Sequence, residues 1–246
     1  MTDAPMVLAL AGVSKRFGAV VAADKVDLSV VAGEAIGIIG ANGAGKSSLF
    51  NLVTGILKAD AGTIMLGGRN ITNESVQYRC RAGLARSFQI PRPFESLSVY
   101  ENLLVAATFG GGIVHGAAPD HCGSILERTG LLAQANVVAG RLRLLDRKRL
   151  ELARALASAP KILLLDEIAG GLTDAEVAEL VQLIRTLHAG GMTIVWIEHI
   201  VHALLSVVSR LVVLEFGRKI ADGEPHAVMA LPEVQRSYLG IEEPAV

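Results

Sequence analysis

The sequence lacks the marks of a secreted protein. Its two cysteines, Cys80 and Cys122, have no CxxC spacing, so nothing indicates a disulfide framework. The first residues, Met1-Thr2-Asp3-Ala4-Pro5, contain neither the basic segment nor the apolar segment of a signal peptide. We therefore expect a protein of the cytosol with reduced thiols.

The sequence also lacks an excess of either charge and a segment that would cross a membrane. Lys and Arg number 23, and Asp and Glu number 24, so charge gives no reason to expect binding to nucleic acid. Hydrophobic residues make up 51% of the chain, but the long uncharged stretch over residues 102–119 contains Gly110-Gly111-Gly112 and Pro119. Because a membrane-spanning helix needs about 20 predominantly apolar residues, this composition favours an apolar surface for a partner instead.

The most informative segment that is present fills every fixed position of the phosphate-binding pattern G-x-x-x-x-G-K-[ST]. A buried strand is predicted before it over residues 35–39, and a helical pattern follows it over residues 48–53. Backbone N–H groups that point together at phosphate need conformations that glycine adopts without a steric clash. We expect a nucleoside triphosphate to be bound by Gly40, Ala41, Asn42, Gly43, Ala44, Gly45, Lys46, Ser47 and Ser48.

Four residues are candidates for the chemistry at the phosphates. Lys46 supplies a charge for the β- and γ-phosphates, and Ser47 offers a hydroxyl to Mg²⁺. The apolar run 162–165 ends in Asp166 and Glu167. Asp166, at the carboxyl end of a predicted strand, suits the Mg²⁺ shell. Glu167 is a candidate general base, and the complete P-loop upstream favours this role over that of a helix N-terminal acid.

Two further polar residues follow predicted strands. His199 comes after the strand predicted over residues 193–197, at the sheet edge where Asp166 also lies, which suits a hydrogen bond to a γ-phosphate. Gln89 follows the strand predicted over residues 84–88 and is a candidate to reach Mg²⁺ or the attacking water through its amide. A lone histidine is more often structural than catalytic, and a glutamine at a strand end is a weak signal by itself.

The order of patterns along the chain predicts an α/β fold. Strand patterns dominate the first third, and strands and helices alternate after residue 160, which implies a largely parallel sheet covered on both faces. Between them lies a mostly helical stretch. No segment resembles a linker, so we expect one domain over residues 1–246 with a helical lobe inserted at about 90–158. The predicted helices cover residues 101–107, 120–129, 146–157, 174–188 and 200–206.

These motifs, in this order, resemble those of the ATP-binding cassette (ABC) family over essentially the whole chain. The matches are Gly40–Ser47 with Walker A, Gln89 with the Q-loop, Ile162–Glu167 with Walker B, Gly170–Asp174 with the D-loop, His199 with the switch histidine and Phe17 with the aromatic residue that stacks on adenine. The resemblance implies a P-loop NTPase with a mainly parallel core sheet, an antiparallel β subdomain and an inserted helical subdomain. It also implies ATP and Mg²⁺ as cofactors. The alternative for Phe17 is an ordinary edge-strand aromatic residue.

Within the family, three stretches look most like the ATPase subunits of branched-chain amino acid importers: residues 83–89, 97–103 and 230–240. This resemblance implies an ATP-hydrolysing subunit at the cytoplasmic face of the cell membrane. Its implied partners are integral membrane permeases and, indirectly, an extracytoplasmic substrate-binding protein. Related importers carry urea, amides and aromatic acids, so the cargo stays open.

One expected motif is altered. ABC proteins carry LSGGQ or LSYGQ before a helix, and this chain has Leu142-Arg143-Leu144-Leu145-Asp146 at that position. Because this loop faces the ATP of the partner subunit in the family, we expect one weakened composite site and a heterodimer with a second, different ATPase subunit. Two alternatives leave that site partly active: Asp146 as the helix N-cap, and Arg143 as a charged phosphate donor.

The apolar segment Ile90–Phe94 after Gln89 is the candidate surface for coupling to a permease. The alternative functions are a non-transport ABC ATPase that acts on nucleic acid or ribosomes, and an ATPase for lipid or lipopolysaccharide export. The absence of a basic stripe and of a coiled-coil insertion disfavours the first of these.

Overall fold

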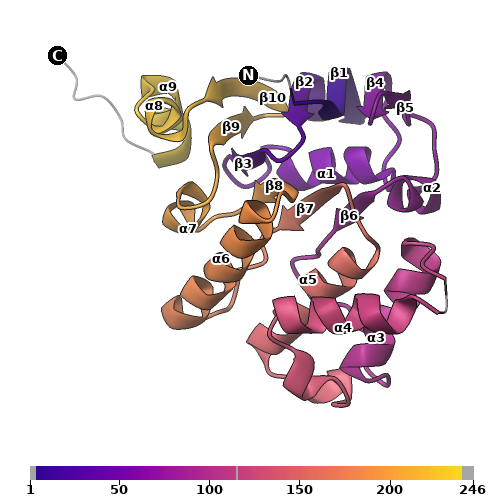
Figure 1. Cartoon of the computed structure of the whole chain (residues 1–246). Coiled ribbons are helices and arrows are strands. Elements are labelled where there is room, and N and C mark those ends of the chain that lie inside the picture. Colours follow the sequence, from indigo (N-terminus) through magenta and orange to yellow (C-terminus); the bar gives the residue numbers. More distant parts are fainter. Residues whose placement is uncertain (1–3, 115, 240–246) are drawn as a thin grey trace. The chain divides into compact units, whose positions relative to one another are not determined.

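The computed structural model describes residues 4–114 and 116–239. They form two compact units: one comprises the residues up to Glu74 and those from Val195 on, and the other runs from Ser75 to Ile194. The chain returns to the first unit within strand β8 (Thr193–Ile197) (Figure 1). The importer-like stretch at the C-terminus ends at Gly240, which lies outside the described residues.

The first unit contains an antiparallel sheet with the strand order β2-β1-β4-β5. Long strands β1 (Met6–Phe17) and β2 (Val20–Val31) form a hairpin, and β4 (Ala61–Leu66) pairs with the other edge of β1. The short strand β5 (Arg69–Asn70) pairs with β4. Buried and exposed side chains alternate along the second half of β2, so one face of the sheet is packed and the other faces solvent.

A second set of strands in the first unit carries the P-loop. β3 (Ala35–Ile39) is buried at every residue and pairs in parallel with β9 (Arg210–Glu215). β10 (Arg218–Gly223) pairs with β9 in the antiparallel direction. Since a strand buried on both faces is a continuous apolar run, the sequence predicts β3 with its observed bounds. The helices of this unit are α1 (Lys46–Thr54), α7 (Val201–Leu205), α8 (Pro225–Met229) and α9 (Pro232–Leu239).

The second unit combines a strand pair with helices. β6 (Leu84–Arg86) pairs in parallel with β7 (Ile162–Asp166). Its helical elements are α2 (Val76–Arg81), α3 (Val99–Val105), the π-helical η1 (Ala106–Gly110), α4 (Ala118–Arg128), the 3₁₀ turns η2 (Leu132–Gln134) and η3 (Ala139–Arg141), α5 (Leu144–Ala157) and α6 (Asp174–Ala189). Helices α3, α4 and α5 pack against one another (Figure 1), and Leu103, Cys122 and Leu150 are buried in them.

Two helices of the second unit begin with a capping box, which fixes their first residue. Before α3, the Ser98 hydroxyl accepts the N–H of Glu101, and the Glu101 carboxylate accepts the N–H of Ser98. Thr173 and Glu176 repeat this arrangement before α6. The hydrogen bonds from the cap residues hold the pKa of both glutamates below its usual value. Both start signals are readable in the sequence.

The predicted fold class is confirmed, since parallel strands, an antiparallel sheet and an inserted helical segment are all present. Several boundaries differ. The strand predicted to end at residue 88 ends at Arg86, and the helix predicted over 101–107 begins at Val99 and continues as η1. The interpretation of Asp146 as an N-cap is wrong, because α5 begins at Leu144 after an extended Arg143.

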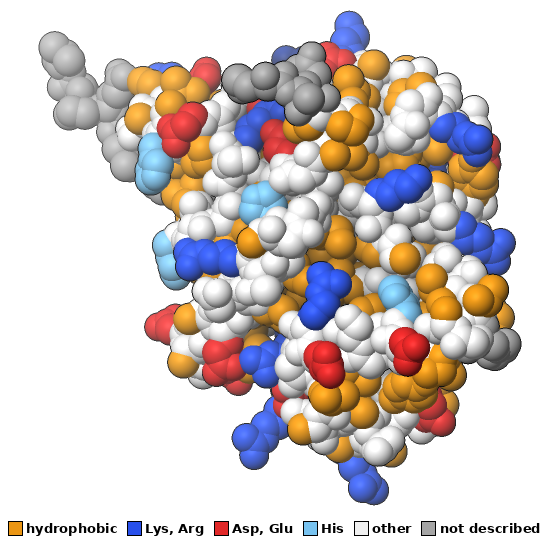
Figure 2. Space-filling model, viewed as in Figure 1, with side chains coloured by type: hydrophobic (Ala, Val, Ile, Leu, Met, Phe, Trp, Pro, Cys, Tyr) orange, Lys and Arg blue, Asp and Glu red, His pale blue; other side chains and the backbone are white. Residues whose placement is uncertain are grey.

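The helices and the surface give two further facts. Among the described residues, no helix combines the length and the apolar character that a membrane crossing requires. On the face drawn in Figure 2, basic and acidic side chains are interspersed with hydrophobic ones rather than gathered into a field of one sign.

Candidate nucleotide-binding and hydrolysis residues

The P-loop of the first unit contains two glycines at which a side chain would clash with the backbone. A Cβ on Gly40 would lie 2.3 Å from the carbonyl oxygen of Leu214, and a Cβ on Gly45 would lie 2.4 Å from that of Ala22. Gly45 also has a φ of 102° as the N-cap of α1. The loop is therefore packed against its own unit, and α1 begins directly behind it with its N–H groups at the loop.

The side chain of Lys46 folds back onto the loop and binds its backbone. Its buried ammonium group donates hydrogen bonds to the carbonyl oxygens of Gly40 at 2.7 Å and Ala41 at 3.1 Å. The predicted residues 40–48 thus lie together as one turn between β3 and α1, with a cation at their centre. Such a cradle of backbone N–H groups and one lysine fits a polyphosphate.

Phe17 lies at the end of β1 with its ring partly exposed. The Lys15 ammonium lies 5.5 Å from the ring centroid and also pairs with Asp60 at 2.6 Å. The hydrogen bonds from the Lys15 side chain and from the backbone N–H of Arg16 hold the pKa of Asp60 below its usual value. The ring is thus held next to a cation on a strand of the same unit as the P-loop.

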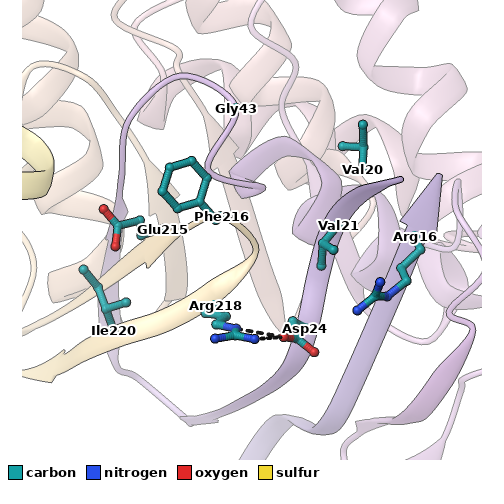
Figure 3. Close-up of a pocket in the computed structure, with 9 residues that line it drawn as sticks. All are labelled: Arg16, Val20, Val21, Asp24, Gly43, Glu215, Phe216, Arg218 and Ile220. Atoms are coloured by element: carbon teal, nitrogen blue, oxygen red, sulfur yellow. Dashed lines mark hydrogen bonds and ion pairs between the residues drawn. The ribbon is translucent and has the colours of Figure 1, made fainter. Parts of the chain in front are cut away.

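A cavity of about 570 Å³ adjoins the P-loop and was not predicted from the sequence. Figure 3 shows Glu215 and Phe216 on one side of it, Val20 and Val21 on the other, and Gly43 above. Its remaining lining residues are Arg16, Asp24, Arg218 and Ile220. Its volume lies within the range of small-molecule sites, and the only sequence signal for it is the Phe216-Gly217 turn.

That turn is tied to the P-loop by its backbone. The N–H of Gly217 donates to the carbonyl oxygen of Ala44 at 2.9 Å, and the N–H of Asp24 donates to the carbonyl oxygen of Gly217 at 2.8 Å. Phe216 has a φ of 44° and a side chain that is 79% exposed. An aromatic residue kept exposed in the left-handed region is unusual, and here it follows from the tight turn between β9 and β10.

In the second unit, the acids predicted at the end of β7 lie beside residues at the end of β6. Glu167 has a φ of 46° and its Oε2 accepts a hydrogen bond from Nε2 of Gln89 at 2.7 Å. Two of the predicted catalytic residues are therefore in direct contact. Asp166 pairs with Arg86 at 2.5 Å, a partner that the sequence reasoning missed although Arg86 lies in the importer-like stretch 83–89.

His199 lies in the first unit, directly after β8, and its side chain is exposed. Its backbone N–H donates to the carboxylate of the buried Glu198 at 2.9 Å. The same oxygen, Oε1, accepts the N–H of Ile200 at 3.5 Å. Glu198 thus fixes the turn that carries His199. The candidate residues form two groups: the P-loop, Phe17 and His199 in the first unit, and Gln89, Asp166 and Glu167 in the second.

The side chains fit Mg²⁺ that is delivered by a nucleotide. Among the described residues, no three or more of His, Cys, Asp and Glu gather into a cluster that would hold a metal ion. Mg²⁺ in NTPases usually keeps several waters and is bound by one or two protein oxygens and by phosphates. The Ser47 hydroxyl and the Asp166 carboxylate are hard oxygen donors of that kind.

The altered motif, residues 142–146, spans the start of α5 in the second unit. Leu145 is 9% exposed, so its isobutyl group packs inward rather than outward from the loop. Asp146 pairs with Arg149 at 3.6 Å, and Arg149 pairs with Glu179 of α6 at 2.6 Å. The exposed residues of the motif are Arg143 and Leu144, so a cation and an apolar side chain replace the small residues expected there.

Phe94, at the end of the segment after Gln89, lines a second cavity, of about 390 Å³, within the second unit. Phe94 is 46% exposed there, and the Arg154 guanidinium lies 5.1 Å from its ring centroid. Arg154 also donates to the carbonyl oxygen of Arg92 at 2.7 Å. The other lining residues are Val76, Gln77, Cys80, Arg81, Val105, Ala106, Phe109 and Gly110.

Helix α5 fastens this segment through a buried carboxylate. Glu151 accepts the N–H of Arg92 at 3.3 Å and pairs with Arg154 at 3.1 Å. Burial raises the pKa of Glu151, and the nearby Arg154 charge opposes that rise. Lys148, also buried, donates to the carbonyl oxygen of Gln89 at 2.5 Å. Residues 89–94 are therefore held by three side chains of the helix that carries the altered motif.

Comparison with known proteins places these observations in a family. A family model described as ABC transporter matches residues 23–170. LivG, the high-affinity branched-chain amino acid transport ATP-binding protein of Salmonella typhimurium, is 38% identical to this chain, with 95% of this chain and 98% of LivG covered. BraF, the protein of the same description in Pseudomonas aeruginosa, is 34% identical over the same shares.

Sequence similarity also extends to another cargo class, and solved structures share the fold. A putative ribose/galactose/methyl galactoside import ATP-binding protein of Burkholderia ambifaria is 34% identical over 89% of this chain and 43% of its own length. The ADP conformation of an ATP-binding cassette of an ABC transporter has a TM-score of 0.86 at 31% identity, covering 96% of this chain and 99% of that one. A nucleotide-free cassette has a TM-score of 0.85 at 29% identity, covering 97% and 100%.

Proposed function

This chain belongs to the ABC transporter family and is an ATPase of that family, and from this premise we propose that it powers import of branched-chain amino acids or related small polar compounds through membrane permeases. The similarity to LivG over nearly the full length of both proteins carries the proposal. The similarity to a sugar import protein covers less than half of that protein, so it supports the family more than the cargo.

In this function, the first unit binds ATP. The N–H groups of residues 40–48 and the Lys46 ammonium hold the phosphates, and Phe17 stacks on the adenine. Ser47 and Asp166 would hold Mg²⁺ brought by the nucleotide, and Gln89 would contribute its amide to the metal or the water. When bound, the metal neutralises charge on the phosphates. His199 donates a hydrogen bond to the γ-phosphate.

Glu167 is the general base that takes a proton from the attacking water or holds that water in line. Two observations support this role. Its backbone lies in the left-handed region at a φ of 46°, a strain that is common at functional sites. Its carboxylate already binds the Gln89 amide at 2.7 Å, so the general base is in contact with the amide proposed to reach the metal or the water.

The two units act as one nucleotide-binding domain over residues 1–246, with about 90–158 as the helical subdomain. The match of the family model, which runs from residue 23 to residue 170 and so includes residues of both units, supports this. Permease subunits dock on the apolar cavity lined by Phe94 and Phe109, because an exposed apolar surface needs a partner. The protein acts at the cytoplasmic face of the membrane, with an extracytoplasmic substrate-binding protein as an indirect partner and no nucleic acid.

The altered motif supports a heterodimer with a second ATPase subunit. Arg143 and Leu144 present a cation and an apolar side chain where serine and small residues usually face the opposite ATP. The ATP held by this chain is then hydrolysed only when its partner carries an unaltered motif. Cooperative, dilution-independent ATPase activity of this chain as a pure homodimer would contradict the heterodimer.

The function is tested by isolating the tagged chain from gently solubilised membranes and identifying its partners by mass spectrometry. We expect two multi-span permeases and a second ATPase, and ATP-dependent uptake of a branched-chain amino acid when the complex is reconstituted in vesicles. Uptake of a sugar and of no amino acid would show that the proposed cargo is wrong. Recovery only from the soluble fraction with ribosomal or nucleic-acid partners would favour a non-transport ABC ATPase. Recovery with a lipid-exporting permease would favour export over import.

A further inference from the structure

Arg86, the last residue of β6, is a buried partner of the metal-side acid. Its Nη2 atom lies 2.5 Å from Oδ2 of Asp166, and both side chains are only 8% exposed. The pairing of β6 with β7 places Arg86 opposite Leu164, and the N–H of Ser87 extends this pairing by donating to the carbonyl oxygen of Leu164 at 2.9 Å. The guanidinium is therefore fixed beside Asp166 by the sheet.

The same cation is held from a second direction. The Arg86 guanidinium lies 5.3 Å from the ring centroid of Phe88, a distance at which cation and ring attract each other. Arg86 and Gln89, three positions apart, thus contact both acids of the second unit, Asp166 through the ion pair and Glu167 through the amide. Arg86 is therefore a member, like Gln89, of the group around the two acids, which we call the acid group: Arg86, Gln89, Asp166 and Glu167.

The charge of this arginine has a consequence for metal binding. A guanidinium keeps its proton at every pH at which a protein is folded, so Asp166 always has a compensating positive charge. A divalent cation that approaches Asp166 alone is repelled by that charge, and burial protects the repulsion from screening by salt. A cation that is already bound to phosphates meets much less repulsion, because the phosphates supply the negative charge that Asp166 cannot.

We propose that Arg86 is a positioning residue that competes with Mg²⁺ for Asp166, so that this carboxylate engages the metal only when the metal arrives on a nucleotide. The proposal rests on the proposed function, because it takes Asp166 as the metal-side acid. Under this proposal, the charge of Arg86 sets the Mg²⁺ concentration needed for half-maximal nucleotide binding. If Arg86 only held the structure together, removing its charge would leave that concentration unchanged.

The test measures binding of a fluorescent ATP analogue to the full-length chain over a series of Mg²⁺ concentrations. Arg86→Met and Arg86→Gln remove the charge, Arg86→Lys keeps it, and Arg128→Met removes an exposed arginine of α4 as the matched control. We expect the half-saturating Mg²⁺ concentration to fall about tenfold in the two uncharged variants. It should stay within about threefold of wild type in Arg86→Lys and be unchanged in Arg128→Met.

A second measurement needs no nucleotide. Mn²⁺ binding followed by electron paramagnetic resonance should be stronger in Arg86→Met than in wild type. Failure of the wild-type chain to bind the ATP analogue would contradict the proposed function, while this Mn²⁺ measurement would still decide the role of Arg86.

Three results would overturn the proposal. One is an unchanged or raised Mg²⁺ requirement in a folded uncharged variant, and another is equal Mn²⁺ binding with and without the Arg86 charge. If both uncharged variants fail to fold because Asp166 is left buried without its partner, Arg86→Lys decides, and a tenfold shift with the charge retained would overturn the proposal.

Discussion

The P-loop and the acid group of the second unit are held in place by different means. The P-loop is shaped by backbone contacts: glycines pressed against Leu214 and Ala22, and a hydrogen bond from Gly217 to Ala44. The acids are held by side chains, Asp166 by Arg86 and Glu167 by Gln89. Because the shape of the P-loop depends on glycine conformations, it is recognisable in the sequence from a pattern of glycines. The side-chain partners of the acids have no such pattern. Substitutions can separate the two groups.

The largest effect is expected from Glu167→Gln, which alters the side-chain-held group alone. We expect ATP turnover to fall by about 100-fold or more, since general-base catalysis contributes that much, while the affinity for ATP stays near that of wild type. Turnover and nucleotide binding measured on the same reconstituted complex check this. The exposed Glu127→Gln on α4 is the control, and near-normal turnover in Glu167→Gln would remove Glu167 from the general-base role.

Gly45→Ala is the reverse experiment, because it alters only the backbone-held group. The new Cβ would meet the carbonyl oxygen of Ala22 at 2.4 Å in a residue with a φ of 102°. We expect nucleotide affinity to fall more than about tenfold and unfolding free energy to drop by about 2 kcal/mol. Calorimetric binding and urea unfolding measure both.

Gly67→Ala supplies the control for Gly45→Ala. Gly67 has a φ of 54°, but no atom lies within 4 Å of the position that a Cβ would take, so only the conformational cost of about 1 kcal/mol applies. Equal losses in the two variants would mean that the contact with Ala22 has no part in the shape of the P-loop.

Phe94→Ala extends the comparison to the cavity beyond Gln89. Because Phe94 lies outside both groups, ATP affinity should not change, whereas transport should fall about fivefold through loss of an aromatic anchor for the permease. Vesicle uptake and nucleotide binding are measured in parallel, with the exposed Val114→Ala as control. Unchanged uptake would place the docking surface elsewhere.

The smallest effect is a pH dependence at Glu151. Burial raises the folded-state pKa of this carboxyl, so its ionisation costs stability that is absent below the unfolded-state pKa and fully felt above the raised folded-state value. Glu151→Gln should therefore gain stability relative to wild type as pH rises from 4 to 8. Urea unfolding at both pH values tests this, and a pH-independent difference would show that Arg154 offsets the cost of burial.

The sequence predicts best what repeats along the chain or uses glycine. β3, β7 and the P-loop are all recognisable because a doubly buried strand is a continuous apolar run and a phosphate loop needs glycine. α2 and β10 were not predicted: α2 has six residues, and β10 is partly polar on an antiparallel edge. In such short or edge elements tertiary contacts outweigh local pattern.

The candidate site was predictable in its residue types and only partly in its contacts. Gln89 and Glu167 were both predicted, but their mutual hydrogen bond was not. It depends on the pairing of β6 with β7, which brings together residues 78 positions apart in the chain. Arg86 and the Phe216 turn have no motif of their own. Leu145 of the altered motif is buried, because helix phase decides which way its side chain points.

The hydrogen bond from Gly217 to Ala44 also has a consequence for the order of folding. The P-loop is complete in sequence by residue 47, yet its bracing turn and its parallel neighbour β9 are synthesised only after the whole second unit. A ribosome-bound chain that has just emerged past α1 therefore holds all the phosphate-binding residues without their support. Because domains fold as units once their partners are available, we expect nucleotide binding to be acquired only after the helical segment has emerged.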